Sequence, residues 1–207
     1  MSEIRRGQSP LGSGPSDRAF THLRLTIVLA TAAPISFNEP MEQTREEQQS
    51  DPKRQMLRHT VATLAYRGAK ALRDAPGGFA QFQLAETTRT PGEILAHVGD
   101  LLDWALALAQ GRQDWKDSPP VEWEAEVRRF FGALDALDLY LISSSALHCT
   151  PEQLFQGPVA DALTHIGQIA MLRRLAKSPI RGENYSRAQI QAGRVGPNQA
   201  EPVREFD

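Results

Sequence analysis

The chain has 207 residues, 41% of them hydrophobic, and its 23 basic and 25 acidic residues give a net charge of −2 at pH 7. This near balance lacks the excess of Lys and Arg that marks a nucleic-acid binder, so no nucleic-acid partner is expected. A single cysteine excludes an intramolecular disulfide framework and a zinc site built from several cysteines. Any metal ion must therefore be bound by His, Asp or Glu, and the chain has five histidines.

The N-terminal region, residues 1–51, differs in composition from the rest of the chain. Residues 7–16 are polar and rich in Gly, Pro and Ser, and residues 42–51 are almost all charged or amide-bearing. Between them, residues 23–32 form the only β-like run of the sequence, and an isolated strand is not stable in water. We therefore expect residues 1–51 to be a disordered leader without a function of its own.

The most apolar run, Leu25–Ala33, is far shorter than the roughly 18–20 residues that span a bilayer. It also resembles the core of a signal peptide, because Arg24 precedes it. However, the segment before it is long and polar and contains Asp17, which is atypical of a signal peptide. We therefore expect a cytoplasmic protein without membrane association.

From Pro52 onward the apolar residues recur at helical spacing. A first helix is predicted over residues 52–74, because the run Ala-Pro-Gly-Gly at 75–78 ends it. A second helix begins at Thr90-Pro91-Gly92-Glu93, which has the pattern of a capping box with proline at the first helical position. Its apolar periodicity continues to a C-terminal end near Gly111.

A third helix is predicted over residues 121–143, and Thr150-Pro151-Glu152-Gln153 is a second capping box that opens a single helical turn. Gly157-Pro158 then begins the fourth long helix. Four helices joined by short links predict an all-α fold, an antiparallel four-helix bundle over residues 52–178. Residues 179–207 are polar and punctuated by Gly and Pro, which predicts an irregular C-terminal tail or a strap across the bundle.

Two histidines fall on apolar faces of the predicted helices. His97 follows Ile94 by three residues and precedes Leu101 by four, which places it at the edge of the inward-facing stripe. His165 has the same relation to the apolar positions of the fourth helix. Asp161 precedes His165 by four residues, so both side chains project from one helical face about 6 Å apart along the axis.

Two imidazoles and one carboxylate on facing helices can form an open three-ligand site for a divalent metal ion. Such a site is also favoured because an inward-facing carboxylate is costly unless it is paired or bound to a cation. In the structural alternative, each histidine bonds a neighbouring carbonyl, and the helix dipole stabilises Asp161 in the first turn of its helix. Asp161 would then only orient His165, and the spacing leaves both interpretations open.

The segment GPVADALTHIGQIAMLRRLA at residues 157–176, together with ILAHV at 94–98, resembles the DinB/YfiT-like family of metal-dependent four-helix-bundle enzymes. That family pattern has one His on the second helix and an H-x-x-x-H pair, followed by Gly-Gln, on the fourth. His97 matches the first of these histidines and His165 the last, whereas Asp161 replaces the remaining one. The resemblance implies a metal site at these three residues. Two nitrogen ligands and one oxygen ligand are suited to zinc, nickel, iron or manganese.

The resemblance also implies an enzyme that acts on a small molecule. Some members of the family are transferases or isomerases that use a low-molecular-weight thiol, and a bound metal ion lowers the pKa of a thiol or water so that its anion exists near pH 7. We therefore expect transfer by an activated thiol, or hydrolysis by activated water. The rival hypothesis is a non-catalytic, stress-associated or dimerisation bundle with a vestigial metal site, which the Asp161 replacement favours. A homodimer is compatible with a small bundle, but the sequence locates no interface.

Other residues with reactive side chains give weaker signals. His148 and Cys149 are adjacent in a loop, and adjacent side chains rarely point at each other, so a nucleophilic pair is not expected. Trp104 lies two helical turns beyond the first candidate histidine and either walls a pocket or belongs to the core. In the tail, Glu183 and Tyr185 are candidates to fold back towards the metal site.

Overall fold

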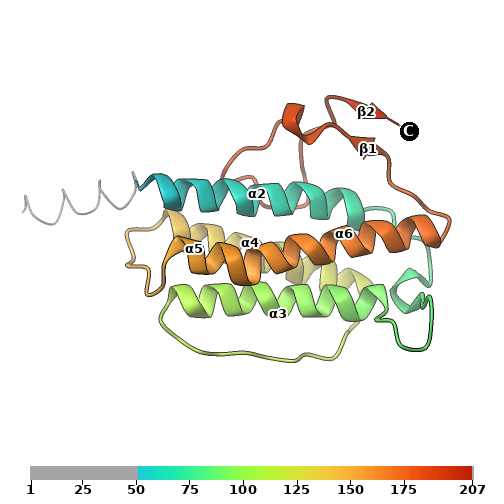
Figure 1. Ribbon diagram of the computed structural model, residues 1–207, viewed down its shortest axis with the longest axis horizontal. Helices are drawn as coiled ribbons and strands as arrows, with labels where there is room; N and C mark the ends of the chain where they lie inside the picture. The colour runs from blue at the N-terminus through green and yellow to red at the C-terminus, as the bar shows by residue number, and fades with distance from the viewer. Residues whose placement is uncertain (1–50, 207) are drawn as a thin grey trace, which may run out of the picture. The chain divides into compact units, whose positions relative to one another are not determined.

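A computed structural model describes residues 51–206, and this part of the chain is mostly helical with little strand (Figure 1). The predicted all-α class is confirmed. Its four long helices are α2 (Pro52–Leu72), α3 (Pro91–Ala109), α4 (Trp123–Ile142) and α6 (Ala160–Leu175). In the part of the chain that is described, no helix combines the length and the apolarity needed to cross a membrane. Of the predicted leader, residues 1–50 lie outside the described residues.

Both predicted capping boxes are present. The side chain of Thr90 accepts a hydrogen bond from the backbone N–H of Glu93, whose carboxylate accepts the backbone N–H of Thr90 at 2.7 Å. Thr150 and Gln153 make the same reciprocal pair at the start of the short helix α5 (Pro151–Leu154). Each box satisfies backbone N–H groups that have no partner within the first helical turn.

Each long helix packs against two others: α3 lies against α4 and α6, and α2 lies against α6 and α4. Arg54 at the start of α2 donates to the carbonyl of Leu141 at the end of α4, so these helices are antiparallel. By contrast, the Tyr140 hydroxyl at the end of α4 donates to the carbonyl of Ala109, the last residue of α3. The helices α3 and α4 therefore run in the same direction. So do α2 and α6, because Arg173 in the last turn of α6 donates to the carbonyls of Ala71 and Arg73 at the end of α2. The predicted antiparallel arrangement is wrong for these two pairs.

Parallel neighbours need a connection that returns along their length. Residues 110–122 make this connection, which runs beside α3 in Figure 1. Extended chain advances about 3.3 Å per residue against 1.5 Å in a helix, so this crossover is long enough to return along the 20 residues of α4. The backbone N–H and the hydroxyl of Ser118 both donate to the buried carboxylate of Asp100 at 2.8 Å, which fixes the crossover to α3.

The fourth predicted helix begins differently from the expectation. Gly157-Pro158 does not start a new helix but lies within a π-helical turn, η2 (Phe155–Val159), that joins α5 to α6 without a break. Proline lacks the N–H of a regular helical hydrogen bond, and a π turn accommodates this loss. As a result, Asp161 lies inside a continuous helical segment rather than at a free helix N-terminus.

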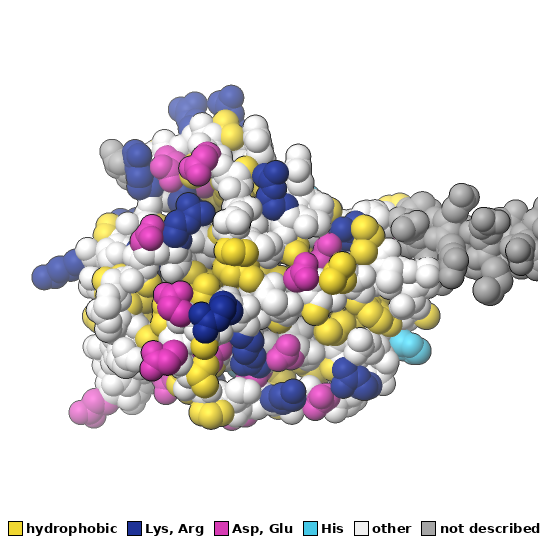
Figure 2. Space-filling view, turned by 180° about the vertical axis from the view of Figure 1, so that it is seen from behind, with side chains coloured by type: hydrophobic (Ala, Val, Ile, Leu, Met, Phe, Trp, Pro, Cys, Tyr) yellow, Lys and Arg dark blue, Asp and Glu magenta, His cyan; other side chains and the backbone are white. Residues whose placement is uncertain are grey.

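The core fills the space between the long helices. Its large, fully buried side chains come from all four of them: Val61, Leu64, Leu95, Val98, Leu102, Phe130, Leu134, Leu137, Leu141 and Ile169. Burial of one such side chain contributes about 1.5–3 kcal/mol relative to exposure, so packing of the apolar faces stabilises these helices more than their intrinsic propensity does. The face seen in Figure 2 carries acidic and basic side chains intermixed, in keeping with the near balance of charge.

Gly68 on α2 marks a close approach to α4, because a Cβ atom at Gly68 would lie 2.5 Å from ring carbons of Phe130. We expect Gly68→Ala to lower the free energy of unfolding by about 1–3 kcal/mol, since overpacking outweighs the gain in helix propensity. Urea denaturation measures this change. Gly132→Ala on α4 is the control, because nothing lies within 4 Å of its added Cβ, and it should stabilise by about 0.5–1 kcal/mol. Equal effects of the two substitutions would contradict the close approach.

The C-terminal segment is a strap on α2. It contains two short antiparallel strands, β1 (Gly182–Glu183) and β2 (Glu205–Phe206), and the turn η3 (Tyr185–Arg187). The buried carboxylate of Glu183 accepts hydrogen bonds from Tyr66 at 2.7 Å and Lys70 at 2.8 Å, and the ring of Tyr185 packs edge-on against Tyr66. The expectation that Glu183 or Tyr185 folds back towards the metal site therefore does not hold, because both residues contact α2.

Candidate metal centre

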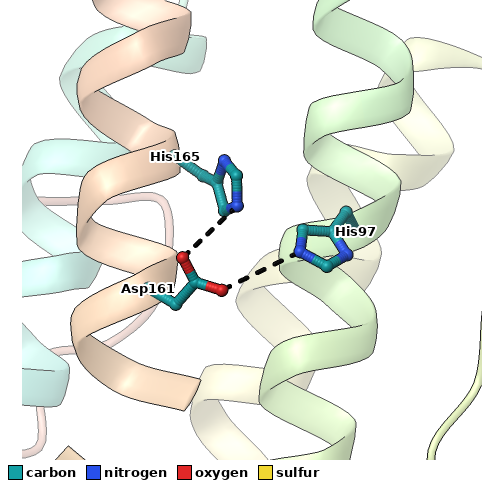
Figure 3. Close-up of side chains that lie close together, drawn as sticks. All are labelled: His97, Asp161 and His165. Atoms are coloured by element: carbon teal, nitrogen blue, oxygen red, sulfur yellow. Dashed lines mark ion pairs between the residues drawn. The ribbon is translucent and has the colours of Figure 1, made fainter. Parts of the chain in front are cut away.

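The three residues singled out in the sequence converge where α3 meets α6 (Figure 3). One nitrogen or oxygen atom from each of His97, Asp161 and His165 lies within 4.8 Å of the other two. The carboxylate of Asp161 lies between the rings: one oxygen is 3.5 Å from Nε2 of His165 and the other is 3.9 Å from Nε2 of His97. Between residues 51 and 206 no other group of three His, Cys, Asp or Glu side chains has spacing suited to a metal ion. These three residues are called the His–Asp–His cluster below.

Helix geometry explains how the cluster is assembled. Asp161 and His165 are four residues apart, so both project from the face of α6 that meets α3. The side chains of His165 and His97 are 13% and 19% exposed, in agreement with their predicted positions at the edge of the apolar stripes. Asp161, in contrast, is 49% exposed. Its carboxylate is therefore hydrated, and the expectation that burial forces it to pair with a cation does not hold.

The structural alternative for Asp161 also loses support. A helix dipole stabilises an acid only near the free N–H groups of the first turn. Asp161 follows η2 within a continuous helical segment, and the backbone N–H of Ala160 just before it is bonded to the carbonyls of Phe155 and Gly157. The position of Asp161 is therefore not explained by a helix N-terminus.

His165 is oriented by a second residue of its own helix. Its Nδ1 atom lies 2.8 Å from the side-chain oxygen of Gln168. An amide oxygen only accepts hydrogen bonds, so Nδ1 is the donor in this contact, and Nε2 is the ring nitrogen that faces Asp161. A hydrogen bond to the second ring nitrogen is the arrangement that orients metal-ligating histidines.

The surroundings of His97 favour its neutral form. Burial lowers the pKa of His97, and the charges of His165 and Arg89 lower it further, against the opposite effect of Asp161. The ring of Trp115, carried by the crossover, lies edge-on to His97 with 5.7 Å between ring centroids. A neutral imidazole has the free lone pair that a metal ligand needs, so His97 is prepared for coordination near pH 7.

Two surface hollows flank the cluster. The aromatic hollow, of about 430 Å³, is lined by His97, Leu101, Trp104, Gln113, Trp115 and Asp161. The apolar hollow, of about 420 Å³, is lined mainly by Leu84, Arg89, Ile94, His165, Met171 and Leu172. Both volumes lie within the roughly 300–1,000 Å³ of small-molecule sites, and one histidine of the cluster faces each hollow.

The other histidines of the described residues, and the cysteine, do not join the cluster. His59 and His148 are exposed, and Cys149 is partly buried. Burial raises the pKa of the Cys149 thiol, the opposite of what a nucleophilic cysteine needs. Trp104 forms part of the wall of the aromatic hollow, which is one of the two roles predicted for it. Its ring packs edge-on against Trp115 with 5.7 Å between centroids.

Two residues near the cluster, Arg89 and Trp115, were not predicted from the sequence, and Gln168 appeared only as part of the Gly-Gln pair of the family pattern. The contact of Gln168 with His165 could have been predicted, because a side chain three residues after His165 lies beside it on the same helical face. Arg89 precedes the capping box and Trp115 lies in the crossover. Neither segment is helical, so helical spacing cannot predict which way these side chains point. Only the tertiary structure brings these two residues to the cluster.

Comparisons with known proteins add no support to the resemblance to the DinB/YfiT-like family. No family model matches the chain, and no curated protein or solved structure shows significant similarity to it. The similarity to the DinB/YfiT-like pattern therefore depends on residues 94–98 and 157–176, whose three candidate ligands lie together at the contact of α3 with α6.

Proposed function

We propose that the protein is a metal-dependent enzyme in which His97, Asp161 and His165 hold one divalent ion. The proposed reaction is transfer or hydrolysis on a small molecule by an activated thiol or water. The observation that supports this most strongly is the convergence of three ligand atoms from two helices within 4.8 Å, between two hollows. We further propose that α2, α3, α4 and α6 form a DinB-like four-helix bundle, on the strength of the motifs on α3 and α6.

The residues of the cluster have complementary roles in this proposal. The ion would supply the acidity that turns a thiol or water into its anion near pH 7. His97 and His165 supply nitrogen ligands, and the hydrogen bond with Gln168 orients the ring of His165. Asp161 supplies a negative charge and is half-exposed, so the side of the cluster that it occupies is open to a second reactant. Two nitrogens and one oxygen suit zinc, nickel, iron or manganese.

The rival proposal is a non-catalytic, stress-associated or dimerisation module whose metal site is vestigial. The 49% exposure of Asp161 favours it, because a hydrated carboxylate gains less from binding a cation than a buried one does. The two proposals differ in one simple property. A ligand that binds only the folded state must raise its melting temperature, whereas a vestigial site produces no such rise.

Elemental analysis of the full chain, purified without a histidine tag, tests the proposed function. We expect close to one divalent ion per chain. Adding the same metal at about 100 times its dissociation constant should stabilise the fold by about 2.7 kcal/mol, a rise in melting temperature of about 5–10 °C. A metal content far below one per chain together with an unchanged melting temperature would refute metal binding and support the rival proposal.

Gln168→Leu tests the orientation of His165. Loss of the hydrogen bond frees the ring to rotate and to change tautomer, so we expect metal affinity to fall by about 10–100-fold. Competition with a chromophoric chelator measures the change. Thr164→Ala on the same helix is the control, because the Thr164 hydroxyl bonds only the carbonyl of Ala160. Equal affinities of the Gln168→Leu variant and the wild type would show that Gln168 does not position His165.

A further inference from the structure

The apolar hollow exposes hydrophobic surface beside His165. Ile94 and Leu172 are 4% and 7% exposed and form its inner part, whereas Leu84 and Met171 at its edge are 56% and 57% exposed. Large apolar side chains left uncovered in a concave surface next to titratable groups are typical of a ligand site. The hollow therefore offers an apolar binding surface that reaches the cluster.

Arg89 gives this hollow a single positive charge. Arg89 is exposed, and within residues 51–206 no hydrogen bond or ion pair engages its guanidinium group. The pKa of Glu93 is lowered mainly by its hydrogen bonds with Thr90 and only slightly by the charge of Arg89, so the cap and not Arg89 holds this carboxylate. Buried arginines elsewhere, such as Arg58 and Arg173, are bonded to carboxylate or carbonyl oxygens. Arg89 is thus a free cation at the rim of an otherwise largely apolar hollow.

The two hollows differ in charge, which indicates where an anion would bind. The aromatic hollow is lined by the carboxylate of Asp161 and contains no Lys or Arg, so in the metal-free protein it repels a negative group. The apolar hollow contains Arg89 and no acidic residue. A planar guanidinium group matches a carboxylate through two parallel hydrogen bonds, and a single arginine balances a single negative charge.

We propose that the apolar hollow binds the substrate of the cluster, and that this substrate is a small molecule with an apolar body and one carboxylate. Its apolar body packs on Ile94 and Leu172, its carboxylate binds Arg89, and its reacting end lies towards His165. The other reactant, a thiol or water, then occupies the aromatic hollow on the other flank of the cluster. The identity of the reacting end rests on the proposed metal-dependent function, but binding in the hollow itself requires only the protein's side chains.

Three small probes test this proposal on the full chain: hexanoate, hexan-1-ol and acetate. Hexanol lacks the negative charge and acetate lacks the apolar body. Isothermal titration calorimetry, with metal-free and metal-loaded protein, measures their affinities. We expect hexanoate to bind at least about tenfold more tightly than either probe, because each buried methylene contributes about fourfold and a charge-assisted hydrogen-bonded pair about tenfold.

Two variants and a matched control assign the binding to the hollow. Arg89→Gln should weaken hexanoate about tenfold and leave hexanol unchanged, and Met171→Ser should weaken hexanoate and hexanol but not acetate. Arg128→Gln on α4 removes the same charge from another exposed arginine and should change none of the affinities. All three substitutions are at exposed positions, and an unchanged melting temperature confirms the fold of each variant.

The outcomes separate this proposal from the proposed function. If hexanol binds as tightly as hexanoate, or if Arg89→Gln leaves hexanoate binding intact, the carboxylate subsite is refuted whether or not the protein binds metal. If hexanoate binding depends on Arg89 in metal-free protein, the subsite is supported. That result holds even if elemental analysis finds no metal. In that case only the proposed function is refuted, and the carboxylate subsite is not.

Discussion

Replacing His97 or His165 with alanine is expected to abolish the stoichiometric metal binding that we propose. Each change removes one of three ligands, so we expect affinity to fall by more than the roughly 10–100-fold that loss of an outer hydrogen-bonding partner costs. Asp161→Ala should have a smaller effect than either, because this carboxylate is 49% exposed and is replaced by water most easily. Metal content after dialysis and chelator competition measure the three affinities.

A control and a reverse substitution make this test specific. His59→Ala removes an exposed histidine of α2 outside the cluster and should leave metal content unchanged. Asp161→His creates the H-x-x-x-H pair of the DinB/YfiT-like pattern and is expected to keep the proposed metal binding. If metal remains stoichiometric in both His97→Ala and His165→Ala, these histidines are not the ligands and the proposed centre is wrong.

Arg173→Leu is expected to lower the free energy of unfolding by about 3 kcal/mol. Arg173 on α6 is 5% exposed, and its guanidinium group donates to the carbonyls of Ala71, Arg73 and Asp74 at the end of α2. These carbonyls have no partners within their own helix, so the substitution leaves buried acceptors unsatisfied. Urea denaturation measures the loss.

The neighbouring arginine provides the matched control. Arg174 is exposed, and Arg174→Leu should change stability by no more than about 0.5 kcal/mol. Arg173→Lys should recover only part of the loss, since one ammonium group lacks the planar fork that reaches several carbonyls at once. Similar stabilities of the Arg173→Leu and Arg174→Leu variants would show that the contacts with α2 contribute little.

The helices could be predicted because their signals are local. Thr90 and Glu93 lie within one turn of each other, and their capping box marks the start of α3 without reference to the rest of the molecule. Gly157-Pro158 was misleading for the same reason: it looks like a helix start, but the capping box at Thr150 has already begun the helix and η2 carries it past the proline. A π turn has no simple sequence pattern.

Helix direction and long-range contacts could not be predicted from local signals. The apolar periodicity of α3 and α4 is the same whether the helices are parallel or antiparallel, so the crossover was not foreseen. Arg173 lies in the last turn of its own helix, where a cation is ordinarily explained by that helix's dipole. It instead binds carbonyls at the C-terminus of α2, about 100 residues earlier in the chain.

The candidate site was predictable only as far as spacing and resemblance extend. The separation of Asp161 from His165 places both on one face, and the DinB/YfiT-like pattern adds His97 from another helix. The exposure of Asp161 could not be predicted, because it depends on how α3 and the crossover cover α6. Arg89 was also missed, since its importance comes from the apolar side chains that tertiary packing places beside it.

The course of the crossover has an optical consequence. Of the three tryptophans in the chain, Trp115 packs edge-on against His97 and Trp104 packs edge-on against Trp115, whereas Trp123 packs against Phe79. One indole ring therefore contacts His97 directly, and a second contacts it through Trp115. Protonation of His97, or an open-shell ion next to it, quenches indole emission at this range. The intrinsic fluorescence of the unlabelled chain thus reports directly on what occupies the cluster.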